Sequence, residues 1–501
     1  MNNNQPYDVV FEVDNNKAYI RHINENAIYK ILSLISRATR FENPEADYLI
    51  KSGYQCARYI KLFNERYMHF PVGLTNLVST ILMENNFHKI KIIDNRPKIN
   101  YNQQKLQRFF DMVPFSLRPY QMEAVNAAIE SSIGGFSMAT GSGKSLIFLS
   151  MVNAFDFERI LIIVNLASLA EQHYKLFKDV LGEDQVGMVG AQNNDTSKPI
   201  TIAVINSLYN SVTGDSKKQF TKWLKEVDCL VLDEYHHSAS MMYRKVLRKC
   251  SNAKRKWGLS ATAFRKYDDD LYMESFVGDV VYRMDTSTLI EQGWLAKANI
   301  IIDDMGEDCP KVRRGAWAKV YKKAIVEYDL LLSKTADWVK FFYERGLKTI
   351  VFVDHLPHGE KLKSVSIGHH ICHERHIEFV HGRMPLSQRN ENFDRFRNGD
   401  LQVLALTSLG NEGLDFPEGD VGINACGGDS PVVATQRLGR ILRKRKQQGE
   451  IDIDPNRHQK VYYVDFIHRQ NIWLHTHSIN RINIYNQERA IPIYVKRETA
   501  A

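Results

Sequence analysis

The chain has 501 residues, of which 44% are hydrophobic and 25% are charged, as is typical of a globular protein with more than one core. No apolar run approaches the roughly 20 residues that a membrane-spanning helix needs. The first residues lack the basic and apolar stretches of a signal peptide. The six cysteines are scattered without a CxxC pair, so no disulfide framework is expected. We therefore expect a cytoplasmic protein with no membrane partner.

The net charge of +8 is distributed unevenly along the chain. Residues 1–110 have a balance of +5 and residues 437–501 a balance of +7, which leaves −4 for residues 111–436. Basic ends suit contact with a phosphate backbone. On this observation alone, solvated surface charge is an equal alternative.

Residues 1–110 predict a small α/β domain, from strand-like alternation followed by helical spacing of apolar residues. From about residue 111, short apolar or β-branched runs alternate with helical stretches, and this rhythm resumes after residue 340. Uninterrupted apolar strands are typical of parallel sheets covered on both faces, so we predict two successive sheets. The expected strands include 8–13, 17–22, 89–93, 160–164, 200–204, 229–232, 349–353, 377–380 and 403–406, and the expected N-terminal helices are 26–37 and 73–85.

The sharpest local motif is Ala139–Ser145, with the sequence ATGSGKS. Its glycines allow backbone N–H groups to close around phosphates, Lys144 can reach the β- and γ-phosphates, and Ser145 can bind Mg²⁺ at a helix N-terminus. The strict pattern has glycine where this chain has Met138. A chance glycine loop is therefore the alternative for this segment taken alone.

Two carboxylates, Asp233 and Glu234, follow the predicted strand 229–232. The carboxyl ends of parallel strands form the ligand-binding edge of a sheet. At that edge Asp233 would hold Mg²⁺ through water, and Glu234 would orient and deprotonate an attacking water. An acidic surface turn is the alternative, and the phosphate loop upstream makes it the weaker one.

A third segment, residues 436–443, places Gln436, Arg437 and Arg440 at helical spacing. Arginines of this kind can neutralise charge on a transferring γ-phosphoryl group. A solvated basic helix is the alternative.

These segments resemble the motifs of the superfamily 2 helicases, and they occur in the order of that family from about residue 117 to residue 444. Two positions depart from the usual pattern, because Asn165 and Ala263 stand where proline is commoner. The matching segments are 117–121 (the adenine-recognising motif), 139–145 (motif I), 165–172 (Ia), 205–208 (Ib), 233–236 (II), 259–265 (III), 351–353 (IV), 407–417 (V) and 436–443 (VI).

The resemblance implies an α/β protein with two tandem RecA-like domains, ATP and Mg²⁺ as cofactors, and hydrolysis in the cleft between the domains. Ser260 and Thr262 would couple nucleotide state to domain closure. The implied catalytic residues are Lys144, Asp233, Glu234, His236, Gln436, Arg440 and Arg443, with Ser145 and Asp233 at the metal. The implied ATP contacts are Arg118, Gln121, Thr140, Gly141, Ser142, Gly143, Lys144, Ser145, Gly413, Asp415, Arg440 and Arg443.

The segment from Ala263 to Ala296 resembles the duplex-DNA branch of the superfamily, and the N-terminal segments 58–63 and 70–74 resemble phage UvsW-type branch-migration helicases. This resemblance implies forked or branched DNA, Holliday junctions or R-loops as substrates, a T5-like phage as the source and the host cytoplasm as the location. A monomer is favoured. The expected nucleic-acid contacts are Arg58, Lys61, Asn165, Asn206, Ser207, Arg265, His381 and Thr407.

We expect residues 1–110 to form a DNA-binding accessory domain, 111–295 the ATP-binding domain, 296–460 the second RecA-like domain and 461–501 a C-terminal extension. An RNA helicase, an ATP-gated nucleic-acid clamp with weak hydrolysis and a stand-alone P-loop signalling ATPase are the alternatives. Seven histidines and Cys372 crowd residues 355–381, a spacing that could support zinc. We favour packing or solvated histidines there.

Overall fold

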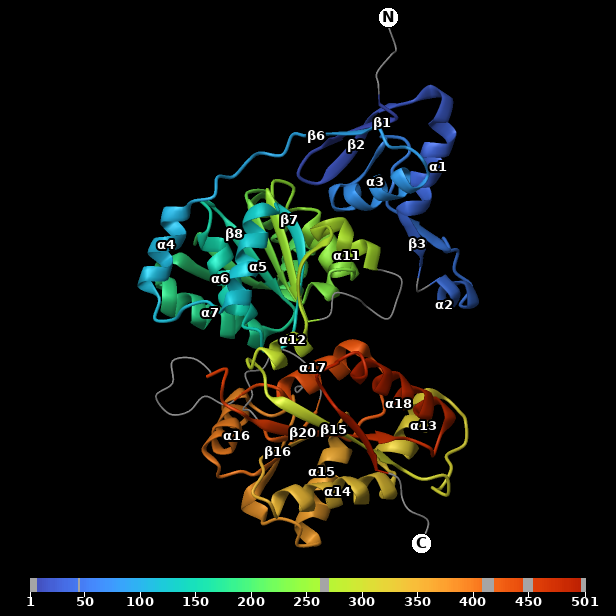
Figure 1. The fold of residues 1–501 in the computed structure, drawn as a ribbon, viewed down its shortest axis with the longest axis vertical. Helices are drawn as coiled ribbons and strands as arrows, with labels where there is room; N and C mark the ends of the chain where they lie inside the picture. Colours follow the sequence, from blue (N-terminus) through green and yellow to red (C-terminus); the bar gives the residue numbers. More distant parts are fainter. Residues whose placement is uncertain (1–6, 44–45, 262–269, 408–418, 445–453, 497–501) are drawn as a thin grey trace, which may run out of the picture. The chain divides into compact units, whose positions relative to one another are not determined.

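The computed structural model describes residues 7–43, 46–261, 270–407, 419–444 and 454–496 (Figure 1). The chain divides into two compact units, Met1–Met138 with Gly143–Arg283, and Met284–Ala501 with Ala139–Ser142. Each unit contains one large, mainly parallel sheet, and the first unit also contains a small N-terminal sheet. No helix in the described ranges is long and apolar enough to cross a membrane.

The N-terminal sheet has the strand order β5-β2-β1-β6, and it confirms the strands and helices expected near the start of the chain. Asp14 closes the turn between the first two strands, because its carboxylate accepts from the backbone N–H groups of Asn16 and Lys17. Phe11 and Phe70 are fully buried and meet edge to face in the core. The elements are β1 (Val9–Val13), β2 (Lys17–Ile23), α1 (Ile28–Ala38), β5 (His69–Pro71), α3 (Thr75–Glu84) and β6 (Ile90–Asp94).

The large sheet of the first unit has the order β10-β9-β11-β8-β12-β13-β7-β14. Its central strands are buried at every residue, as expected for parallel strands with both faces covered. The strands are β7 (Ile133–Met138), β8 (Ile160–Val164), β9 (Val186–Gly190), β10 (Asn193–Asn194), β11 (Ile200–Val204), β12 (Cys229–Asp233), β13 (Arg255–Ser260) and β14 (Val280–Met284). The helices are α4 (Gln103–Met112), α5 (Pro119–Glu130), α6 (Lys144–Asn153), α7 (Ala167–Leu181), α8 (Ile205–Thr213), α9 (Lys217–Lys225), α10 (Met241–Leu247) and α11 (Asp270–Val277).

The sheet of the second unit has the order β17-β18-β16-β19-β20-β15-β21, with parallel pairing throughout. The C-terminal segment belongs to this sheet, and its buried Arg481 forms two hydrogen bonds of 2.8 and 2.9 Å to the carboxylate of Asp465. The strands are β15 (Lys297–Asp304), β16 (Thr349–Phe352), β17 (Ile377–Val380), β18 (Val403–Leu406), β19 (Val421–Asn424), β20 (Lys460–Ile467) and β21 (Ile493–Lys496). The longer helices are α14 (Asp329–Tyr343), α15 (Leu356–Gly368), α16 (Leu386–Asn398), α17 (Pro431–Ile441) and α18 (Ile472–Tyr485).

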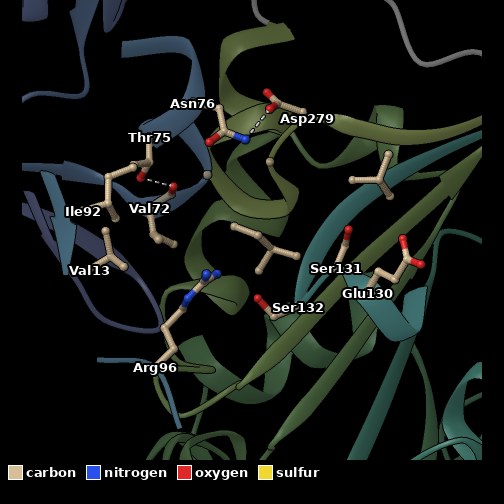
Figure 2. Close-up of a pocket in the computed structure, with 14 residues that line it drawn as sticks. Val13, Val72, Thr75, Asn76, Ile92, Arg96, Glu130, Ser131, Ser132 and Asp279 are labelled. Atoms are coloured by element: carbon tan, nitrogen blue, oxygen red, sulfur yellow. Dashed lines mark hydrogen bonds between the residues drawn. The ribbon is translucent and has the colours of Figure 1, made fainter. Parts of the chain in front are cut away.

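Polar and close-packed contacts join the N-terminal sheet to the large sheet of the same unit. Lys256, which is buried on β13, donates to the backbone carbonyl of Asn15 and, at 2.7 Å, to Oδ1 of Asn16 in the β1–β2 turn. Asn76 on α3 donates to Asp279 at 2.8 Å (Figure 2). A cavity of about 270 Å³ lies beside this hydrogen bond, with Arg96 at its wall.

A two-stranded ribbon makes a further contact with the first large domain. It consists of β3 (Arg40–Glu42) and β4 (Tyr59–Lys61), paired antiparallel. Phe41 points inward and meets Tyr272 of α11 edge to face at 4.9 Å between ring centroids. The alternate side chains of the ribbon, including Tyr59 and Lys61, are exposed.

Candidate active site

The glycine loop connects β7 to the start of α6. Gly141 and Gly143 have φ values of +85° and +80°, a left-handed conformation that other residues adopt only with strain. A side chain at residue 143 would also collide with Gln121, whose Nε2 lies 2.4 Å from the position of such a Cβ. The loop therefore presents its backbone at the N-terminus of a ten-residue helix, the arrangement that binds phosphate groups.

Gln121 is thus brought beside the glycine loop, as the motif order leads one to expect. It lies in the first turn of α5 and is 2% exposed. Its Oε1 accepts from the backbone N–H of Arg118 at 2.9 Å, and Arg118 also donates to the hydroxyl of Tyr120. These contacts fix the amide group of Gln121 next to Gly143.

Asp233 ends β12, and Glu234 follows in a left-handed conformation with φ of +48°. This conformation directs the Glu234 carboxylate to Lys144, whose Nζ lies 2.9 Å from Oε1. Ser260, at the end of the neighbouring strand β13, donates to Oε2 at 3.1 Å, and His236 Nδ1 lies 2.7 Å from the Ser260 hydroxyl. Four residues from three distant segments of the chain therefore form one network at the carboxyl edge of the sheet.

The electrostatics of this network keep Glu234 ionised. Burial alone would raise the pKa of its carboxyl group, but the Lys144 ammonium and the contact with His236 hold that pKa well below its usual range. A buried, ionised carboxylate beside a phosphate loop is suited to orient a water molecule and to accept its proton.

Tyr235 is a residue whose packing the motif analysis did not predict. Its ring lies across β13 and β7, where a side chain at Gly258 would come within 2.6 Å of the ring and one at Gly135 within 2.8 Å of the hydroxyl. The two glycines therefore leave the space that the Tyr235 ring fills. The pairing of β13 with β7, which aligns these glycines, is a tertiary feature.

His173 is a second residue that the motif analysis missed. It lies in α7, is 2% exposed, and places Nε2 at 2.9 Å from Oδ2 of Asp233. The only signal in the sequence is a polar residue on the buried face of a predicted helix. That pattern does not indicate which residue the histidine contacts.

Several predicted residues lie outside the described part of the chain. They are Thr262, Arg265, Gly413 and Asp415. Of motif III, Leu259, Ser260 and Ala261 are described, and of motif V only Thr407 is.

In the second unit, Gln436, Arg437 and Arg440 are all buried on α17. Arg437 donates to Asp354 at 2.9 Å and to Asn424 at 2.8 Å, so it supports the core of its own domain. Burial raises the pKa of Asp354, but the Arg437 guanidinium outweighs this effect and lowers it. Arg443, beyond the end of the helix, is half-buried.

The nucleic-acid candidates fall at three places. Asn165 follows β8, while Asn206 and Ser207 begin α8 directly after β11, so all three lie at the carboxyl edge that also carries Asp233. In the second sheet the neighbouring strands β17 and β18 are followed by His381 and Thr407. Lys61 is exposed on the N-terminal ribbon, and Arg58, directly before β4, is exposed as well.

Three of the histidines between residues 355 and 381 form hydrogen bonds to protein groups. His376 Nδ1 lies 2.7 Å from the hydroxyl of Tyr343, while His373 and His381 each accept from a backbone N–H two residues later. Within the described ranges, no three His, Cys, Asp or Glu side chains gather in a group that could hold a metal ion.

Comparison with known families identifies the class of this protein. The res subunit of type III restriction enzymes matches residues 114–265, and the helicase conserved C-terminal domain matches residues 333–445. Together these matches cover just over half of the chain. The chain belongs to the superfamily 2 helicases.

The chain is also similar to individual proteins. The DNA 3′-5′ helicase XPB of Kineococcus radiotolerans is 25% identical over 345 residues, which is 67% of this chain and 58% of the relative. This chain spans only about half the length of some of the curated relatives that it matches. The structure of UvsW from bacteriophage T4 aligns over 98% of this chain and 99% of its own, with 16% identity and a TM-score of 0.45.

The helicase Lhr of Mycobacterium smegmatis, solved with single-stranded DNA and AMP-PNP, has a TM-score of 0.53 to this chain at 18% identity. The match covers 78% of this chain and 50% of Lhr. It confirms the predicted fold of two RecA-like parallel-sheet domains. A small α/β region precedes them, as expected.

Proposed function

We propose that the chain is an ATP-dependent DNA helicase or translocase that remodels forked or branched DNA. The observation that carries this proposal is the network of Lys144, Glu234 and Ser260 at the carboxyl edge of a parallel sheet. It combines a phosphate-binding loop with an ionised general base in a chain that matches both helicase domains.

Within this proposal, Lys144 holds the β- and γ-phosphates and Glu234 orients and deprotonates the attacking water. Ser145 and Asp233 offer a hydroxyl and a carboxylate, the oxygen ligands that Mg²⁺ prefers, so these residues fit a divalent cation carried by the nucleotide. When bound, Mg²⁺ would neutralise charge on the phosphate groups.

The remaining nucleotide contacts follow from the motif positions. We assign Arg118 and Gln121 to the adenine base. The backbone of residues 140–143 is assigned to the phosphates. In the second domain, Gln436, Arg440 and Arg443 are assigned to the γ-phosphoryl group, and Gly413 and Asp415 to the link between nucleotide and nucleic acid.

DNA is the proposed substrate because the XPB relative carries a DNA 3′-5′ helicase name. The same name supports 3′–5′ movement. We propose that polar residues following β8 and β11, among them Asn165 and Ser207, contact one strand of the DNA. Such contacts go mainly to phosphates, so we expect binding that is sequence-tolerant and sensitive to salt.

Branched DNA is proposed on the strength of the N-terminal region. Its ribbon exposes Tyr59 and Lys61, and Arg58 directly before β4 is also exposed, while Phe41 on the opposite face anchors the ribbon to the first large domain. A basic and aromatic surface on a firmly docked element is suited to grip a DNA arm. We further propose that the protein works as a monomer in the cytoplasm, of the host cell if its source is a phage. A T5-like phage remains the predicted source.

The test is the ATPase rate with no nucleic acid, single-stranded DNA, duplex DNA, a Holliday junction and single-stranded RNA. The expected result is strongest stimulation by the junction, followed by its resolution into arms. Strongest stimulation by RNA would overturn the DNA assignment. A Lys144→Ala variant should lose hydrolysis and keep DNA binding, and full activity in that variant would overturn the active-site assignment.

A further inference from the structure

His173 is the one side chain in the described part of the chain that donates to the carboxylate of Asp233. Its Nε2 lies 2.9 Å from Oδ2, and the two side chains are 2% and 5% exposed. Because an ionised carboxylate only accepts hydrogen bonds, Nε2 carries the proton in this contact. The other carboxylate oxygen, Oδ1, accepts from the backbone N–H of Glu234 at 3.0 Å. The Asp233 carboxylate is therefore held at both oxygens.

Aromatic side chains from two helices hold the imidazole ring. Phe148, on the helix that follows the glycine loop, meets His173 edge to face at 5.8 Å, and Phe177 on α7 does so at 6.5 Å. Both phenylalanines are fully buried. The ring thus connects the helix of the phosphate loop with the carboxylate at the end of β12.

Apart from Asp233, the ring contacts of His173 are with the apolar side chains of Phe148 and Phe177. Nδ1 of His173 is buried and makes no hydrogen bond within the described residues. A buried polar ring with a single polar contact costs free energy that an apolar side chain of similar volume would not. The contact with Asp233 is therefore what the histidine adds.

We propose that His173 is a positioning residue for the divalent cation bound with the nucleotide. It orients the Asp233 carboxylate so that the remaining lone pairs of that group face the cation. This inference rests on the proposed function, in which Asp233 is a metal-site residue. Groups that hydrogen-bond a ligand carboxylate fix its orientation, and their loss typically weakens metal affinity by about 10–100-fold.

The experiment measures how Mg²⁺ controls nucleotide binding in the full chain. A fluorescent, non-hydrolysable ATP analogue is titrated in EDTA, and Mg²⁺ is then titrated at a fixed analogue concentration. The variants are His173→Leu, which removes the donor, and His173→Gln, whose amide can replace Nε2. His468→Leu is the matched control, since His468 is also a buried histidine but bonds the carbonyl of Cys426 in the second sheet.

His173→Leu should raise the midpoint of the Mg²⁺ titration, the Mg²⁺ concentration that gives half of the change in analogue binding, by about 10–100-fold. It should leave the affinity for the analogue in EDTA unchanged. His173→Gln should recover most of this loss, and His468→Leu should leave the midpoint unchanged. A native midpoint in His173→Leu would overturn the inference, as would an equal loss of affinity in EDTA, which indicates a purely structural role. If the native chain bound the analogue without any effect of Mg²⁺, the proposed function itself would be overturned.

Discussion

Lys144 and Glu234 form a partly buried ion pair, with Nζ 2.9 Å from Oε1 and only 14% and 13% of the two side chains exposed. Lys144 thus neutralises the proposed general base. A nucleotide that draws Lys144 to its phosphates would leave Glu234 with Ser260 and His236 as its remaining partners. Under the proposed function, nucleotide binding therefore releases the base that hydrolysis needs.

Replacing Glu234 by glutamine tests this relationship. The amide cannot accept a proton, so we expect the DNA-stimulated ATPase rate to fall by at least about 100-fold. Binding of a non-hydrolysable ATP analogue should stay close to that of the native protein, because the phosphate loop is unchanged. Glu183→Gln is the control, since Glu183 is exposed and, among the residues that the structure describes, forms an ion pair only with Lys178. A native rate in Glu234→Gln would remove Glu234 from the mechanism.

Gly73 provides a test of how the N-terminal sheet is attached. A Cβ at this position would lie 2.0 Å from the carbonyl oxygen of Glu274 and 2.9 Å from the backbone nitrogen of Gly278. Backbone atoms cannot move aside cheaply, so Gly73→Ala should lower the free energy of unfolding by about 1–3 kcal/mol. Gly368→Ala, at a helix end with open space around it, should have little effect. Denaturant unfolding measures both, and equal stability of the two variants would contradict this close packing.

Much of this architecture could be predicted from the sequence, because its signals are local. The runs at 160–164, 200–204 and 403–406 consist of apolar or β-branched residues without interruption, which is typical of buried parallel strands. The glycine loop and the Asp233–Glu234 pair were likewise visible from the spacing and type of their residues. Each of these features needs only a few consecutive residues to be recognised.

The features that sequence analysis missed depend on partners that are distant in the chain. His173 and Asp233 are 60 residues apart, and Lys256 meets a turn 240 residues earlier. Nothing in the residues around Lys256 distinguishes it from an exposed lysine. Its environment follows only from how the N-terminal sheet docks on β13.

The cysteines give a prediction about chemical reactivity. Cys56 is half-buried, while the other five thiols are buried. Burial raises the pKa of Cys250 to about 12 and that of Cys372 to about 11, which removes their reactive thiolate at neutral pH. A brief treatment of the native protein with an alkylating reagent should therefore label Cys56 alone, as measured by peptide mass spectrometry. Cys56→Ser should abolish this labelling, and unfolding should expose all six sites. Rapid labelling of Cys250 would contradict its burial.

Lys256 predicts how stability depends on pH. Burial lowers the pKa of its ammonium group from 10.5 to about 8 in the folded protein. Between these values the folded state has lost the proton that the unfolded state still binds, so the free energy of unfolding rises with pH. Across the whole interval the contribution of this group is about 3 kcal/mol.

Lys256→Met isolates this contribution, because methionine does not titrate and has a similar length. Denaturant unfolding at several pH values from 7 to about 10.5 should show the native protein gaining stability relative to the variant as pH rises. Lys245→Met is the control, since Lys245 lies on the surface of α10. The difference in free energy of unfolding between this variant and the native protein should not change with pH over the lower part of this range. The free energies of unfolding of the native protein and of Lys256→Met could instead differ by a constant amount from pH 7 to about 10.5. That result would show that Lys256 keeps its proton when buried. The turn at Asn15 and Asn16 would then hold a charged ammonium group, and its carbonyl oxygens would be the groups that stabilise that charge.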